Sequence, residues 1–456
     1  MVRQGLAGVR IGTLTLGCKV NQYETDSMRE LLEAAGAELT EFEDEADVYL
    51  VNTCSVTNMA ERKSRQMLHR ARKKNADALV VAVGCYVQTT PKEVLNDLSV
   101  DIVVGNNRKK EIATILEDAI AKRNPSGEAC HWLDINRKAE YESLTISHMT
   151  EHTRAYIKIQ DGCNQFCSYC IIPYVRGRIR SRAPEEVLEE IEHLAEQGCK
   201  EVVLTGIHLS SYGKDWEQET ASDGRLNGVP LLQLIQRIDK IKGICRIRLG
   251  SLEPRIMTEA FVTELAKVEK LCPHFHLSLQ SACDETLKRM NRKYTIEEYM
   301  EGCKRLRKAF DRPALTTDVI VGFPGETEEE FETTYENLKK LNLYEMHIFK
   351  YSRRRGTRAE QMPNQIPEPV KTLRSDRLLE LTAEQKKRYE DSFCGEIQRV
   401  LVEECLDTEK KRLAEGCGEE AEAGKQWYVG HTERYQRVTL QSERDVRNQI
   451  VEVIGS

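Results

Sequence analysis

Three closely spaced cysteines constrain this chain more than any other feature of its sequence. Residues 162–174 read GCNQFCSYCIIPY, which places Cys163, Cys167 and Cys170 in a C-x3-C-x2-C pattern. Cysteine thiolates are the usual ligands of iron–sulfur clusters, and such clusters normally take four of them. A local run of three therefore predicts a 4Fe–4S cluster with one iron that lacks a protein ligand.

This spacing resembles the radical-SAM superfamily, in which an aromatic residue, here Tyr169, precedes the last cysteine. By that resemblance the open iron would chelate the amino and carboxylate groups of S-adenosylmethionine (SAM), and an electron from the cluster would cleave the sulfonium to a 5′-deoxyadenosyl radical. The alternatives are a zinc site or three unrelated thiols. Structural zinc usually takes four ligands in paired C-x2-C units, and no second close pair follows.

Composition bounds the remaining possibilities. A length of 456 residues predicts about three domains, and 40% hydrophobic with 31% charged residues is typical of a soluble globular protein. The net charge of -7 argues against a generally cationic nucleic-acid binder but allows local basic patches. Fifteen dispersed cysteines favour reduced thiols and metal ligands. Without a signal peptide or an apolar run of membrane-spanning length, we expect a cytoplasmic protein with no membrane partner.

The first part of the chain, residues 8–120, alternates apolar runs with helical patterns. Each apolar run is followed by an amphipathic stretch, which predicts parallel βαβ units and an N-terminal parallel α/β domain. The strands are expected at Val9–Leu16, Val48–Asn52, Ala78–Val83 and Asp101–Val104.

A cysteine follows each of the first three of these strands, namely Cys18, Cys54 and Cys85. Ligands bind beyond the carboxyl ends of strands in an open parallel sheet, so we expect these thiols to meet at one edge. They would form a second three-cysteine cluster site. The alternative is that each is simply a small buried side chain, which is common for free cysteine.

The residues around these cysteines carry a more specific resemblance. The segments LGCKVNQYET, NTCSVTNMAERKSRQ and VGCYVQ resemble the N-terminal domain of the methylthiotransferases. The resemblance implies that Cys18, Cys54 and Cys85 hold an auxiliary 4Fe–4S cluster. The helix after Cys54 is basic, and Arg62 on it is a candidate for phosphate contact; the alternative is a solvated helix face.

Residues 121–148 are polar and predict a linker, and residues 149–388 predict a second α/β domain. Six apolar runs, each followed by a helical pattern, indicate a central open (β/α)6 barrel of the radical-SAM type. Active sites of such barrels lie at the carboxyl ends of the strands, and the three-cysteine motif follows the first one. The six strands are expected at Arg154–Gln160, Glu201–Thr205, Arg246–Gly250, His274–Leu279, Thr317–Val321 and Glu345–Tyr351.

Residues at the ends of the later strands are candidates for SAM binding, because the loops at these positions hold SAM in the radical-SAM enzymes that the chain resembles. Glu253 or Gln280 would bond the ribose or the amino group, and Phe323 with the glycine backbone would flank the adenine. The alternatives are helix caps, turns and core positions. The full candidate set is Gly206, Ser251, Glu253, Gln280, Gly322 and Phe323.

Two arginine-rich segments follow the first and last barrel strands. Guanidinium groups suit phosphate, so these segments are expected to contact an RNA backbone at the mouth of the barrel. The alternative is a strand face turned to water. The candidates are Arg176, Arg178, Arg180, Arg353 and Arg354.

The last segment, residues 390–456, reads as four short strands and predicts a small all-β barrel. It resembles the TRAM domain of RNA-modifying enzymes, although it is rich in Glu and not basic overall. RNA binding would need a local face, with Arg434 and Tyr435 as candidates. The alternative is a protein-binding module.

Taken together, the three parts resemble the methylthiotransferases from end to end. The segments LGCKVNQYET, NTCSVTN and GRIRSR resemble the enzymes that act on N6-threonylcarbamoyladenosine (t6A) in tRNA, on the 3′ side of the anticodon. The resemblance implies two 4Fe–4S clusters, SAM, the tRNA anticodon stem-loop, an electron donor such as flavodoxin or ferredoxin, and a sulfur source. The alternatives are isopentenyladenosine tRNA, a ribosomal-protein aspartate, or a non-catalytic iron–sulfur RNA-binding protein.

Overall fold

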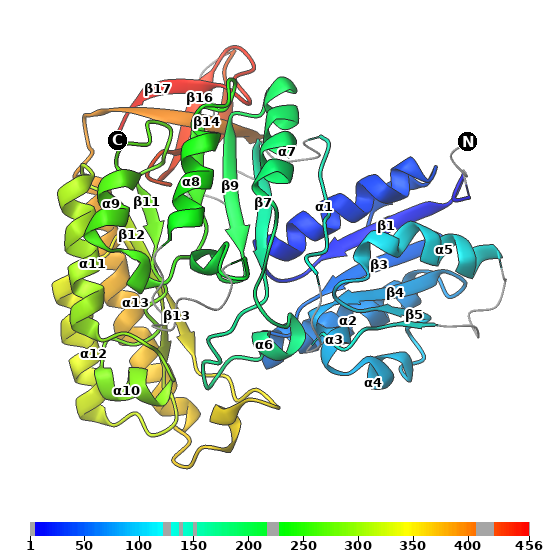
Figure 1. Ribbon diagram of the computed structural model, residues 1–456, viewed down its shortest axis with the longest axis horizontal. Coiled ribbons are helices and arrows are strands. Elements are labelled where there is room, and N and C mark those ends of the chain that lie inside the picture. The colour runs from blue at the N-terminus through cyan, green and yellow to red at the C-terminus, as the bar shows by residue number, and fades with distance from the viewer. Residues whose placement is uncertain are drawn as a thin grey trace.

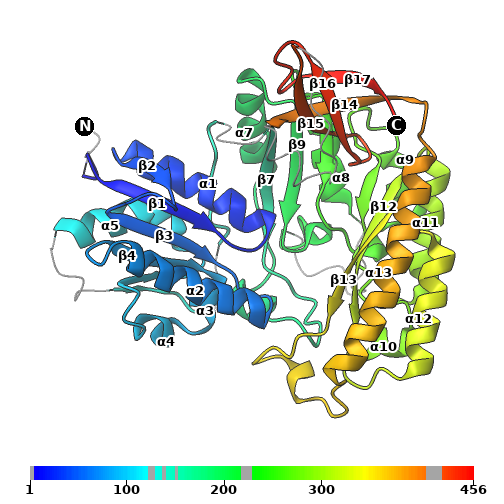
Figure 2. The same ribbon diagram turned by 180° about the vertical axis from the view of Figure 1, so that it is seen from behind.

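The computed structural model describes residues 5–121, 129–135, 140–148, 153–216, 228–406 and 424–455. The first sheet lies beside a central barrel, and the C-terminal strands cross one end of that barrel (Figures 1 and 2). Among the described helices, none is long and apolar enough to cross a membrane. The acidic stretch between residues 407 and 423 lies outside the described residues.

The first sheet has six parallel strands in the order β2-β1-β3-β4-β5-β6. Apolar clusters cover both faces, as expected for parallel strands that are buried on both sides. The short strands β2 and β6 are not among the strands that the sequence predicts, because their residues are mostly polar. The strands are β1 (Arg10–Thr15), β2 (Glu38–Glu41), β3 (Val48–Thr53), β4 (Leu79–Gly84), β5 (Ile102–Val104) and β6 (Cys130–His131).

Helices pack on both faces of this sheet. Met28 and Leu32 of α1 join one apolar cluster with Ile112 of α5, and Leu68 of α2 joins the other. The helical segments are α1 (Lys19–Ala34), α2 (Asn58–Lys74), α3 (Cys85–Thr89), α4 (Pro91–Leu95), η1 (Lys109–Glu111) and α5 (Ile112–Ala121).

The central part confirms the predicted open (β/α)6 barrel. Parallel pairing joins β7 to β9 to β10, and β11 to β12 to β13, while the isolated bridges Ile247–Leu271 and Leu252–Leu277 connect the two groups. The short strand β8 (Arg180–Ser181) runs antiparallel along β7. The six barrel strands are β7 (Arg154–Asp161), β9 (Glu201–Gly206), β10 (Arg246–Leu249), β11 (His274–His276), β12 (Ala314–Val321) and β13 (Glu345–Lys350).

Helices cover the outside of the barrel and bury a large apolar cluster against it. Two of them, α11 and α12, begin with capping boxes built from Thr295 with Glu298 and from Thr327 with Glu330, which satisfy their first amide groups. The covering helices are α7 (Pro184–Glu196), α8 (Val229–Ile238), α9 (Glu259–Leu265), α10 (Asp284–Arg289), α11 (Ile296–Ala309), α12 (Glu328–Leu341) and α13 (Glu368–Asp391), while the short α6 (Ile172–Val175) packs against Cys85 of the first part of the chain.

The C-terminal strands form an antiparallel sheet in the order β16-β15-β14-β17, a half-barrel consistent with a TRAM-like domain. It docks on the barrel through guanidinium groups that donate to its backbone. Arg246 donates to the carbonyl oxygens of His431 (3.0 Å) and Arg399 (2.7 Å). The strands are β14 (Ile397–Leu406), β15 (Gln426–Thr432), β16 (Arg437–Ser442) and β17 (Ile450–Ile454).

The long helix α13 is tied to the loop after β12 by a buried ion pair. Arg374 donates to Glu326 at 2.8 Å, and both side chains are at most 5% exposed. Replacing Arg374 with Met leaves the Glu326 carboxylate buried and short of a partner, so the free energy of unfolding should fall by about 3–5 kcal/mol. Chemical denaturation of the apoprotein measures the change.

The matched control is Arg388→Met on the same helix, whose pair with Glu384 is exposed on both sides. Loss of an exposed pair of this kind should cost less than about 1 kcal/mol. Equal effects of the two substitutions would contradict the assignment of Arg374 as the anchor of α13.

Candidate functional site

The first three predicted cysteines lie at neighbouring strand ends. Cys18 follows β1 and precedes α1, Cys54 follows β3, and Cys85 is the first residue of α3 after β4. Burial raises the pKa of the Cys54 thiol to about 11, and the nearby Cys85 and Cys18 contribute in the same direction. Gly17 allows this approach, because a Cβ there would lie 2.9 Å from Cys54 Sγ. The structure therefore brings the three thiols together.

The second set occupies the loop after β7. The amide of Cys163 donates to the carbonyl of Gly177 (3.0 Å), and that of Cys170 donates to the carbonyl of Cys167 (3.0 Å). Burial raises the pKa of the Cys163 thiol to about 11 and also raises that of Cys170. At Gly162 the backbone φ is +72°, and a Cβ would meet the carbonyl oxygen of Arg178 at 1.8 Å. Glycine is required at that turn.

Hydrogen-bond donors point at the sulfurs of both sets. Arg292 donates to Cys167 Sγ at 3.3 Å, and Arg176 Nε donates to Cys85 Sγ at 3.3 Å. N–H groups aimed at sulfur stabilise thiolate ligands and clusters. All cysteines in the described segments are free thiols. The donor set therefore fits a 4Fe–4S cluster at each triad.

The two triads lie close to one another. Cys85 packs in one small apolar cluster with Ile171, which directly follows Cys170, and with Val175. The side-chain amide of Asn106 donates to the carbonyl of Val175 (2.7 Å), which also ties the first sheet to the loop of the second triad. A substrate bound between the two sites would therefore face both.

A buried network of ion pairs connects the segments that carry the two triads. Glu24 accepts hydrogen bonds from Arg176 (2.5 and 3.0 Å), from Lys158 (2.7 Å) and from Lys109. Burial alone would raise the pKa of Glu24, but the three cations outweigh it and hold that pKa well below its usual range. Each cation comes from a different segment, so one carboxylate connects α1, η1, β7 and the chain after the second triad.

The predictions that Arg176, Arg180 and Arg354 contact RNA are wrong. Arg176 is fully buried in the Glu24 network, and Arg180 lies beside Asp161 with its guanidinium group donating to the carbonyl of Arg176. Arg354 is 5% exposed and pairs with Glu61 of α2. These guanidinium groups cross-link parts of the protein and are not available to phosphate.

Of the four other arginines predicted to contact RNA, three are exposed and one bonds to the barrel. Arg62, Arg178 and Arg353 are exposed, and Arg178 lies 4.5 Å above the Phe166 ring. Arg434 donates to the carbonyl oxygens of Arg312 (3.1 Å) and Asp311 (3.0 Å), and so anchors the C-terminal sheet to the barrel. The three exposed arginines remain predictions.

The predicted SAM-binding residues follow the barrel strands, as expected, but not all of them are accessible. Gly206 ends β9, Ser251 is exposed after β10, and the amide of Gly322 donates to Glu326 (2.7 Å). Gln280 has a φ of +75° in the loop after β11. Glu253 is buried and accepts hydrogen bonds from Arg255 (2.5 and 3.0 Å).

The prediction that Phe323 flanks the adenine of SAM is wrong. Its side chain is fully enclosed and packs edge-to-face on Tyr169 and Tyr351, so it belongs to a small apolar core behind the cysteine loop. It therefore cannot flank an adenine ring directly. It supports Tyr169 within the C-x3-C-x2-C loop instead.

Sequence reasoning missed His208. It lies in the loop after β9, and its Nε2 is buried with no hydrogen-bond partner among the described residues. Nδ1 lies 2.6 Å from Ser211 Oγ, and Nε2 is 3.8 Å from Glu253. Burial lowers the pKa of His208 to about 4. An unpaired buried nitrogen at the carboxyl end of a barrel strand fits a polar ligand there.

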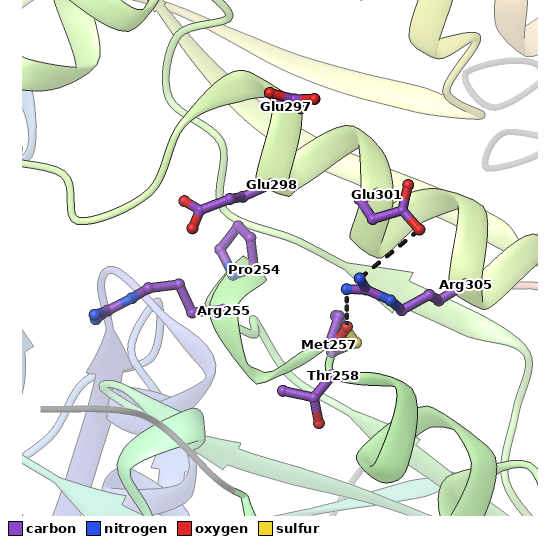
Figure 3. A pocket seen from close by; sticks show the side chains of 8 residues that line it. All are labelled: Pro254, Arg255, Met257, Thr258, Glu297, Glu298, Glu301 and Arg305. Carbon is purple, nitrogen blue, oxygen red and sulfur yellow. Dashed lines mark hydrogen bonds and ion pairs between the residues drawn. The ribbon is translucent and has the colours of Figure 1, made fainter. Parts of the chain in front are cut away.

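A surface pocket between η3 (Pro254–Ile256) and α11 does not belong to this site. Figure 3 shows its lining side chains, with Arg305 bonded to the carbonyl of Met257 at 3.0 Å. None of the predicted site residues lines it. Its walls are acidic and partly neutralised by Arg305 and Arg255.

Comparison with known proteins places this architecture in a family. Residues 157–338 match the radical SAM superfamily, and residues 10–105 match the uncharacterized protein family UPF0004. The chain is 39% identical over 441 residues to the threonylcarbamoyladenosine tRNA methylthiotransferase MtaB of Bacillus subtilis (strain 168), covering 96% of this chain and 92% of that protein. The chain belongs to the radical-SAM methylthiotransferase family.

Two further relatives are similar in sequence, and one solved structure shares the fold. Identity is 40% to the MtaB protein of Aquifex aeolicus (strain VF5), over 87% of this chain and 93% of that one. Identity is 35% to the tRNA-2-methylthio-N(6)-dimethylallyladenosine synthase of Caldicellulosiruptor saccharolyticus, over 86% and 81%. The methyltransferase TsrM from Kitasatospora setae shares the fold, with a TM-score of 0.55 at 16% identity over 75% of this chain and 72% of that one.

Removing the shared carboxylate tests the network. Glu24→Gln leaves Arg176, Lys109 and Lys158 buried with too little negative charge, so the free energy of unfolding should fall by about 3–5 kcal/mol. Because Arg176 also donates to Cys85, the reconstituted variant should hold less iron per chain. Denaturation and iron analysis measure the two effects.

Glu33→Gln is the matched control, since Glu33 lies on the same helix with its side chain 44% exposed. It should change neither stability nor iron content. A Glu24→Gln protein that is as stable and as iron-rich as this control would contradict the role given to the network.

Proposed function

We propose that this protein is a tRNA methylthiotransferase that converts t6A beside the anticodon to its 2-methylthio derivative. The observation that carries the proposal is the placement of two three-cysteine sites against each other, at the carboxyl ends of two parallel sheets, in a chain of this family. Two sites that are each one ligand short suit two clusters that must both reach one substrate atom.

Cys163, Cys167 and Cys170 would hold the cluster that binds SAM, and Cys18, Cys54 and Cys85 would hold the auxiliary cluster. Ser251, Glu253, Gln280, Gly206 and Gly322 would surround SAM, and His208 joins this set because of its unpaired nitrogen. When bound, the clusters and SAM supply the radical chemistry that replaces the C2 hydrogen of the adenine with a methylthio group. That hydrogen is not acidic enough for removal by a general base.

The side chains of this protein position and insulate the reaction. Arg292 and Arg176 donate to ligand sulfurs, and the enclosed core around Phe323 supports the cysteine loop. The exposed arginines Arg62, Arg178 and Arg353 would contact the RNA backbone. A base in an anticodon loop is already largely unpaired, so turning it into the site costs little.

The same proposal assigns roles to the parts of the chain and to its partners. The division into residues 8–120, 149–388 and 390–456, joined by the linker 121–148, would separate the auxiliary-cluster, radical-SAM and TRAM-like parts. An electron donor such as flavodoxin or ferredoxin and a sulfur source would complete the reaction. Since the substrate is tRNA, the protein would work in the cytoplasm.

Nucleoside analysis of tRNA tests the substrate. In a strain that lacks this protein, 2-methylthio-t6A should disappear and t6A should accumulate, relative to the parent. Loss of the 2-methylthio-dimethylallyl nucleoside instead would keep the reaction and change the substrate. Unchanged tRNA would overturn the proposal.

The two triads should differ in which step of the reaction requires them. Substituting Ala for all of Cys163, Cys167 and Cys170 should abolish both reductive SAM cleavage and methylthio product. Substituting Ala for Cys18, Cys54 and Cys85 should keep SAM cleavage and lose only the product. Chromatography of 5′-deoxyadenosine and of the modified RNA measures both, and loss of SAM cleavage in a folded variant of the second kind would contradict the assignment.

A further inference from the structure

The concave face of the barrel is polar and carries a side-chain cluster that the cysteine sites do not use. Strand side chains alternate between two faces, and Phe275, Leu315, Val319 and Ile348 point into the helix-covered core. Their neighbours in the strands therefore face the inside of the barrel. Those neighbours include His276, Asp318 and His347.

These three residues contact one another across three adjacent strands. His276 Nε2 lies 3.3 Å from Asp318 Oδ2, the rings of His276 and His347 stack with centroids 5.8 Å apart, and Asp318 is the register partner of His347. His276 Nδ1 is fixed by Thr316 Oγ1 at 3.0 Å. His347 is exposed, so a ligand in the barrel can reach the cluster.

Positive charge collects on the opposite side of the same interior. Arg154 and Arg248 lie 5.0 and 4.8 Å from the ring of Tyr435, and Lys19 lies 5.8 Å from it. The two arginines have acidic partners, Glu403 (3.1 Å) and Glu201 (2.8 Å). Lys19 forms no ion pair within 4.0 Å in the described part of the chain and contacts two aromatic rings instead, those of Tyr156 and Tyr435.

The His276–Asp318–His347 cluster and the basic residues around Tyr435 are connected through His274. The ring of His274 lies 5.1 Å from that of Tyr435, and His274 is two residues before His276 on the same strand face. Lys19 directly follows Cys18 of the first triad. Because Lys19 is adjacent in the chain to a ligand of the first triad, a group bound between Lys19 and His347 would extend from the neighbourhood of that triad into the barrel.

We infer that the barrel interior binds the N6-threonylcarbamoyl group of the substrate, with Lys19 pairing with its carboxylate and the His276–Asp318–His347 cluster bonding its hydroxyl and ureido groups. This inference rests on the proposed function and adds the part of the protein that recognises the modification. An anionic, hydrogen-bonding group fits a cationic and polar wall. A dimethylallyl group has neither the carboxylate that would pair with Lys19 nor the polar groups that would bond the cluster, so it would gain neither interaction.

Two synthetic anticodon stem-loops test the inference: one carries t6A, and the other carries the same nucleoside with its carboxylate replaced by a neutral carboxamide. The wild-type protein with both clusters should use the carboxylate RNA with a kcat/KM roughly 10- to 100-fold higher, the range for one charged hydrogen bond. Lys19→Met should lower kcat/KM for the carboxylate RNA to about the carboxamide value. Lys304→Met, at an exposed lysine on α11, is the matched control.

Iron content of each variant shows whether the neighbouring cluster site is intact, and Asp318→Asn provides a change on β12, a strand that carries none of the six cysteines. Asp318→Asn should lower kcat/KM for both RNAs by a similar factor and keep the preference for the carboxylate. A Lys19→Met protein with full iron content that still prefers the carboxylate would overturn the inference while the proposed function stands. Wild-type protein that cleaves SAM but forms no product from t6A RNA would overturn both.

Zinc titration separates a structural or catalytic metal from substrate recognition. If Zn²⁺ binds stoichiometrically, is lost in His347→Ala and is needed for product, the cluster is a metal site and its part in the inference is wrong. If Zn²⁺ does not bind, or binds without effect on product, recognition of the threonylcarbamoyl group stands.

Discussion

One buried carboxylate holds the two halves of the site together. Glu24 follows the first cysteine by less than two helical turns, and it binds three cations that come from η1, the first barrel strand and the segment after the second triad. Asp161 supplies a second acid to Lys158 at 2.7 Å. Removing charged groups from water is costly, so such a network persists only when every member is paired. Its effect is to fix the first sheet against the barrel at the point where the cysteines meet.

The strands and the cysteine loops could be predicted from local sequence, because alternation of apolar runs and the strand-end rule are short-range signals. Cys18, Cys54 and Cys85 illustrate this, since each follows a strand of a parallel sheet. The arginines illustrate the limit. The stretch VRGRIRSR shows positive charge, but the partners that bury Arg176 and Arg180 lie at Glu24, Asp161 and Asn107, up to 152 residues away. Local sequence cannot tell a solvated arginine from one that cross-links two sheets.

The sequence predicts a TRAM-like C-terminal barrel and leaves its partner open between RNA and protein, and the contacts of this sheet give it a structural role. Its backbone carbonyls accept hydrogen bonds from Arg246 and Arg248 of β10, and Tyr435 is inserted among Arg154, Arg248 and His274. The sheet therefore covers one end of the barrel. The side chains that dock the sheet, on β7 and β10, and the polar cluster of β11, β12 and β13 both face the interior of the barrel, which is therefore polar.

The most direct test of the account is whether the two clusters interact. With both clusters reconstituted and reduced, the electron paramagnetic resonance spectrum should show spin–spin coupling, because Cys85 packs directly against the residue that follows Cys170. The reference is the sum of spectra from two variants, each lacking one triad. A wild-type spectrum that departs from this sum agrees with a single joined site; one that equals the sum would contradict it.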